Sequence, residues 1–188
     1  MCLEFSFGFM LMASLLWLLD TGGLLSALLP GLLIHECGHA LALSLCGARV
    51  IKIRFEACGL RLDYAGVLSG REELLCALAG PGAGLLYALC TAGLGKAAHS
   101  KFLLCSGGIA LLQSLFNLLP APMLDGGRAL RALGFQKTVL TGSLTGAVLF
   151  AFGVLSFRRI FGPATALAGL WLTIGTCQQH FQGIKYTN

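Results

Sequence analysis

Two histidines, His35 and His39, stand one helical turn apart with Glu36 between them. Together they form an HExxH pattern within an almost wholly apolar stretch, 24–46. Residues four apart lie on the same face of a helix, so both imidazoles can bind one metal ion. The intervening glutamate is placed to reach a metal-bound water. The pattern predicts a hydrolytic zinc site.

Two histidines are too few for a catalytic zinc site, which usually has three protein ligands and an open fourth position. The best third candidate is Asp125, which follows two helix-breaking prolines, Pro120 and Pro122. An ionisable group at membrane depth is costly unless it coordinates a metal or pairs. Irregular backbone at that depth must be buried or line a wet cavity. We therefore expect Asp125 to complete the site and His99 and His180 to be solvated or interfacial.

Long apolar segments must position these residues. The chain has 188 residues, of which 56% are hydrophobic and 11% charged, and its mean hydropathy is +0.83. This composition is unlike that of a soluble domain and predicts an all-α polytopic membrane protein. A span needs about 20 apolar residues. Six segments are candidates: 3–19, 25–46, 73–94, 102–119, 138–156 and 163–179.

The charge distribution predicts topology and argues against nucleic-acid binding. The net charge is +5, but the basic residues form no run or basic face. With six spans, nine Lys and Arg lie on the side of the N-terminus and four on the other. The positive-inside rule then places both termini in the cytoplasm and brings the histidine pair and Asp125 to the same side. The connections leave no room for a soluble domain, so we predict one domain, 1–188.

The segment 49–64, between the second and third predicted spans, breaks the helical pattern. Apolar Ile51 and Ile53 alternate with charged Lys52 and Arg54, and the alternation resumes after a short turn. Period-two alternation on both sides of a turn predicts a small, membrane-associated β-hairpin. The hairpin can lie on the membrane surface as a plug or offer an edge strand to an extended peptide. The two roles are compatible.

The third predicted span contains a run of small residues, 79–84, with the sequence AGPGAG. Small residues let helices approach closely in lipid. The favoured interpretation is therefore tight helix packing with a local kink at Pro81.

Two motifs of the chain resemble those of the site-2 protease family of intramembrane zinc metalloproteases. The HExxH at 35–39 is similar to the first family motif, and the segment 117–126, NLLPAPMLDG, is similar to the second. The resemblance covers a three-span core, about 24–134. The six-span layout without a PDZ or nucleotide-sensing domain looks most like compact bacterial sporulation-type members. Gly84 departs from the family, which often has Asn there.

The resemblance implies a role for each matching residue. It makes His35, His39 and Asp125 the ligands of Zn²⁺ and Glu36 the general base. It also places Asn117 and Pro120 in the part of the site that binds the substrate. The implied enzyme is a metalloendopeptidase that lies in a bacterial cell membrane as a multi-pass protein. Its expected substrate is a single-pass membrane protein, such as a pro-sigma or anti-sigma factor, and an inhibitory membrane partner is an open question.

Three other functions fit parts of the pattern. A membrane metal transporter would also carry His and Asp in its spans, but its polar groups would be distributed across the bilayer. A non-catalytic regulator that binds transmembrane segments would have no use for Glu36. A membrane desaturase would need several histidine clusters, and the chain has four histidines in all.

Overall fold

The computed structural model describes most of the chain and divides it into two compact units. These are Met1–Phe116 and Asn117–Asn188. The described residues are 2–20, 22–56, 59–135, 138–155, 165–174 and 176.

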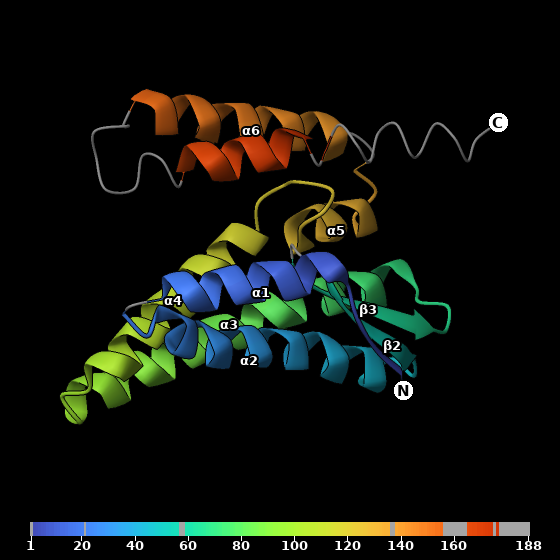
Figure 1. The fold of residues 1–188 in the computed structure, drawn as a ribbon. Helices are drawn as coiled ribbons and strands as arrows, with labels where there is room; N and C mark the ends of the chain where they lie inside the picture. Colours follow the sequence, from blue (N-terminus) through green and yellow to red (C-terminus); the bar gives the residue numbers. More distant parts are fainter. Residues whose placement is uncertain are drawn as a thin grey trace. The chain divides into compact units, whose positions relative to one another are not determined.

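Four helices and a small sheet make up the first unit (Figure 1). The helices are α1 (Phe7–Leu19), α2 (Leu24–Leu45), α3 (Gly70–Ala97) and α4 (Lys101–Asn117), the last ending one residue inside the second unit. The predicted spans at 25–46, 73–94 and 102–119 correspond to α2, α3 and α4. The prediction of a single apolar segment over 3–19 is wrong at its beginning, because Cys2–Phe5 is the strand β1.

The long helices α2 and α3 are apolar on the outside and small or polar on the inside. On α2 the exposed positions include Leu29, Leu33 and Leu41, whereas Gly31 and His35 are buried. A soluble helix shows the opposite pattern, with its large apolar side chains turned inward. The arrangement suits a helix whose outer surface contacts lipid.

Helices α2, α3 and α4 pack against one another through small residues. A Cβ added to Gly31 of α2 would lie 2.9 Å from the Cβ of Ala110 in α4. The buried hydroxyl of Ser106 in α4 donates to the carbonyl of Ala27 in α2, at 2.7 Å. Close backbone approach and hydrogen bonds between helices are the usual means of association in lipid.

The sheet has three strands in the order β1-β2-β3, with β2 (Arg49–Glu56) in the centre and β3 (Gly59–Ala65) at one edge. Strands β2 and β3 are antiparallel, which confirms the predicted hairpin. Strand β1 pairs with β2 in parallel, and its Phe5 ring stacks on that of Phe55 at 4.6 Å between centroids. The third strand was not predicted.

The second unit contains α5 (Asp125–Ala132), α6 (Thr138–Leu155) and a helix over Thr165–Ile174. Glycines let the last two approach closely. A Cβ on Gly146 of α6 would lie 2.9 Å from the backbone nitrogen of Thr173, and one on Gly169 would lie 2.6 Å from the carbonyl oxygen of Gly146. Such contacts leave no room for a side chain at either position.

Two of the described helices, α2 and α3, are long and apolar enough to cross a membrane. Helix α1 has 13 residues and α4 has 17, fewer than the roughly 20 of a typical span. The predicted span at 163–179 extends beyond the described residues. The apolar helices thus favour a membrane protein, and the number of six spans stays a prediction.

Candidate metal centre

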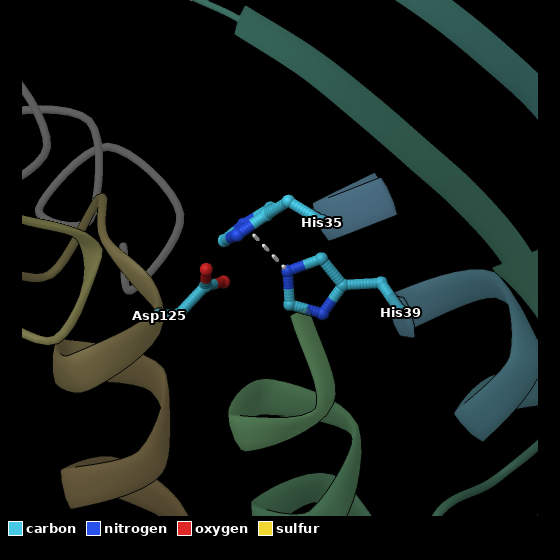
Figure 2. A group of neighbouring side chains, drawn as sticks. All are labelled: His35, His39 and Asp125. Atoms are coloured by element: carbon cyan, nitrogen blue, oxygen red, sulfur yellow. Dashed lines mark hydrogen bonds between the residues drawn. The ribbon is translucent and has the colours of Figure 1, made fainter. Parts of the chain in front are cut away.

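The two histidines of the HExxH pattern lie on the buried face of α2, where one helical turn separates them. His35 is 3% exposed and His39 is 7% exposed. Their Nε2 atoms face each other at 3.2 Å, and the ring planes meet at 80° (Figure 2). The structure therefore brings the two imidazoles together, as their spacing predicts.

A hydrogen bond of His39 Nδ1 determines which nitrogen of this ring can bind a metal. His39 Nδ1 lies 2.8 Å from the backbone carbonyl oxygen of Cys76 in α3, and both residues are buried. A carbonyl only accepts hydrogen bonds, so Nδ1 carries the hydrogen and donates it. Nε2 then keeps its lone pair and points toward His35. Metal-binding histidines commonly show this arrangement, in which the outer nitrogen donates to a carbonyl or carboxylate.

The distance between the two Nε2 atoms fits a tetrahedral zinc ion. Zinc–nitrogen bonds of about 2.0–2.1 Å at a tetrahedral angle place two ligand nitrogens about 3.3 Å apart. The observed separation of His35 Nε2 and His39 Nε2 is 3.2 Å. Two imidazole rings can therefore take up zinc with little movement. Without metal, the same distance suits a hydrogen bond between them.

One glycine of α3 makes room for the His39 ring, and a second lies beside the His35 ring. A Cβ on Gly80 would lie 2.5 Å from Cε1 and 2.6 Å from Cδ2 of the His39 ring. A Cβ on Gly84 would lie 3.8 Å from Nδ1 of His35. These glycines are four residues apart on α3, as the histidines are on α2. Each ring thus faces a position without a side chain.

The AGPGAG run of α3 thus has two functions, one of which the sequence interpretation missed. A Cβ on Gly38 of α2 would lie 2.8 Å from the Cβ of Ala83, which agrees with the predicted close packing. The accommodation of the His39 ring by Gly80 was not predicted. The signal was present in the sequence, since Gly80 and Gly84 repeat the four-residue spacing of the histidines.

Glu36 follows His35 in α2 and is half-buried. Successive residues of a helix are turned by about 100°, so its side chain begins on the face next to that of the histidines. This is the place that the HExxH pattern requires of a general base.

The third predicted ligand, Asp125, is the first residue of α5 in the second unit, and Figure 2 labels it. Asp125 is 9% exposed, and one of its carboxylate oxygens lies 3.8 Å from Nη1 of Arg128. A Cβ on Gly126 would lie 2.6 Å from the carbonyl oxygen of Leu119, and Gly127 faces the carbonyl of Ala121 even more closely. The paired glycines thus let the preceding loop fold onto the beginning of α5.

Asn117 and Pro120 lie where the helix α4 ends. Asn117 is the last residue of α4 and is half-buried, and Pro120 is half-buried in the following turn. The carbonyl oxygen of Pro120 accepts a hydrogen bond from the Thr141 hydroxyl, at 3.0 Å. The predicted helix break before Asp125 is confirmed, although α4 ends at Asn117 and not at 119 as predicted. The contact of these residues with a substrate stays a prediction.

A comparison with solved structures finds a protease of similar fold. The chain is similar to the site-2 protease from Methanocaldococcus jannaschii with a TM-score of 0.69 and 22% sequence identity. The match covers 94% of this chain and 89% of that one. No protein-family model matches the chain, and no curated protein matches it by sequence. The chain therefore has the fold of that site-2 protease.

Proposed function

We propose that the chain is a zinc metalloendopeptidase that cleaves a peptide bond in or near a transmembrane segment of another membrane protein. The observation that carries the proposal is the pair of buried imidazoles on α2, with Nε2 atoms 3.2 Å apart. Their helix is apolar on its outer surface, as a helix in lipid would be. The site-2 protease fold supports the same activity.

The zinc ligands in this proposal are His35, His39 and Asp125. Two imidazoles and one carboxylate are a common donor set of catalytic zinc sites. Each is at most 9% exposed, and buried ionisable groups usually pair or coordinate a metal. Bound zinc would supply a polarised carbonyl and an acidified water at neutral pH.

Glu36 is the proposed general base. Its carboxylate takes a proton from the attacking water and later returns that proton to the leaving amine. The carbonyl of Cys76 holds the His39 ring in the tautomer that presents Nε2 to the metal. Glu36 therefore transfers a proton in the reaction, whereas the Cys76 carbonyl orients a zinc ligand.

The proposed substrate is a single-pass membrane protein whose transmembrane helix unwinds before cleavage. The amides of an intact helix are bonded internally, so its peptide bonds are poorly accessible. Strand β3 pairs with β2 along one side and lies at the edge of the sheet, where an extended segment can add by strand pairing. Asn117 and Pro120 are the proposed contacts nearer the scissile bond.

The remaining expectations belong to the same proposal. The protein is multi-pass in a bacterial membrane with both termini in the cytoplasm, and the substrate is a regulator such as a pro-sigma or anti-sigma factor. The charge balance of the predicted loops supports the orientation. An inhibitory membrane partner would be a further component.

The test compares wild-type protein with Glu36→Gln, with both forms purified in detergent and incubated with membrane-anchored reporter proteins. The reporters are chosen from single-pass proteins that accumulate in cells that carry Glu36→Gln. Wild type should release a soluble fragment, and the variant should bind zinc without cleaving. Glu73→Gln, which alters a glutamate near the beginning of α3, is the matched control and should cleave normally. Undiminished cleavage by Glu36→Gln would exclude the proposed base.

A further inference from the structure

Ser114, a residue of α4, has a buried hydroxyl that makes no hydrogen bond within the described part of the chain. The residue is 1% exposed. Buried polar groups are nearly always paired, and an exception needs an explanation. Ser106, two turns earlier on the same helix, shows the usual state: its hydroxyl lies 2.7 Å from the Ala27 carbonyl and 2.8 Å from the Tyr87 hydroxyl.

The hydroxyl of Ser114 occupies the space that the missing side chain of Gly84 leaves on α3. A Cβ on Gly84 would overlap Ser114 Oγ, and the same point lies 3.8 Å from Nδ1 of His35. Helices α2, α3 and α4 thus meet where the unpartnered hydroxyl of Ser114 and one edge of the His35 imidazole both lie beside Gly84. All three residues belong to the first unit.

The two imidazoles differ in the surroundings of their Nδ1 atoms. Nδ1 of His39 donates to the Cys76 carbonyl at 2.8 Å. The corresponding nitrogen of His35 is on the side of its ring that faces Gly84 and Ser114. A histidine that binds a metal through Nε2 usually donates its Nδ1–H to a neighbouring acceptor, and that acceptor sets the orientation of the ring.

From this geometry we infer that Ser114 is a positioning residue for His35, an inference that rests on the proposed zinc site. When Nε2 of His35 binds the metal, its Nδ1–H donates to Ser114 Oγ. The Ser114 side chain can turn about its Cα–Cβ bond, which has three staggered positions, and one of these is proposed to make the contact. Gly84 leaves the space in which the hydroxyl turns, and a side chain there would fill this space.

The experiment measures zinc affinity of the full-length protein in detergent by competition with a chelator. Ser114→Ala should bind zinc about 10–100-fold more weakly than wild type, the usual effect of losing such a partner. Gly84→Ala keeps the hydroxyl but fills the space in which it turns, and should weaken binding in the same way. Ser106→Ala, which also removes a buried hydroxyl of α4, is the matched control and should leave zinc affinity unchanged.

Thermal unfolding of the metal-free protein separates positioning from a purely structural role. Ser114→Ala loses no hydrogen bond of the metal-free structure, so its Tm should equal or exceed that of wild type. Ser106→Ala loses two partners and should unfold at a lower temperature. Wild-type zinc affinity in Ser114→Ala would overturn the inference and leave the protease proposal intact. Failure of wild type to bind zinc would instead refute the protease proposal.

Discussion

Gly80 of α3 gives the sharpest prediction about the zinc site, because its missing side chain makes room for the His39 ring. In Gly80→Ala the new Cβ would lie 2.5 Å from Cε1 of His39. An ordinary contact between carbons is about 3.5 Å or more, so the ring or the helix must move by about 1 Å. Zinc sites tolerate deviations of about 0.2 Å in ligand distance. We therefore expect zinc affinity to fall at least 10-fold.

The same substitution should have a smaller effect on stability. Overpacking a tight contact costs about 1–3 kcal/mol. Replacing a helical glycine by alanine recovers about 0.5–1 kcal/mol of conformational free energy. The net loss in free energy of unfolding should therefore be about 0–2.5 kcal/mol, and the protein should still fold. Zinc binding should be impaired more clearly than folding.

Gly82→Ala is the matched control for this test, because it lies two residues along α3 and a Cβ there meets nothing within 4 Å. Both variants are purified in detergent, and zinc binding is measured by chelator competition alongside thermal unfolding by circular dichroism. Gly82→Ala should bind zinc as wild type does. Equal zinc affinity in Gly80→Ala and Gly82→Ala would refute the account of how α3 accommodates His39.

Three further predictions follow from other parts of the chain. The carboxylate of Asp20 accepts hydrogen bonds from the backbone amides of Leu24 and Leu25, at 2.8 and 2.9 Å. The hydrogen bond from the Leu25 amide is the largest cause that lowers the Asp20 pKa. The stabilisation of the fold by the ionised Asp20 carboxylate should therefore be present above the unfolded pKa of 3.8 and disappear as pH falls through the lower folded value. The Tm difference between wild type and Asp20→Asn should therefore shrink on acidification, and a difference that grows would contradict this sign. Gly127→Ala places a Cβ against the Ala121 carbonyl and should lower the free energy of unfolding by about 1–3 kcal/mol in chemical denaturation, whereas Gly93→Ala, with open space, should not. A zinc chelator should abolish cleavage of a membrane-anchored reporter and added zinc should restore it, whereas cleavage that survives complete zinc removal would contradict a metalloprotease.

The sequence predicted those features that depend on local periodicity. The four-residue spacing placed His35 and His39 on one helix face, and period-two alternation predicted the hairpin of β2 and β3. Both signals lie within short windows. The helix break before Asp125 was equally local, since it follows from Pro120 and Pro122.

The features that the sequence did not predict depend on pairs that are distant in the chain. Strand β1 reads as the beginning of an apolar helix, and only its parallel pairing with β2 makes Cys2–Phe5 a strand. The carbonyl that holds His39 belongs to Cys76, 37 residues away. Likewise, a lone serine in an apolar helix gives no sign that Ser114 lies beside Gly84. Such contacts follow from helix packing, which local patterns do not specify.

The central claim is that zinc is held by His35, His39 and Asp125. Its most direct test is the zinc content per purified chain, measured by mass spectrometry in wild type and Asp125→Ala, with Asp20→Asn as the control for loss of an aspartate. Wild type and Asp20→Asn should each contain about one zinc ion per chain, and Asp125→Ala should contain less than about a tenth of that. One zinc ion per chain in Asp125→Ala, or none in wild type, would contradict the account.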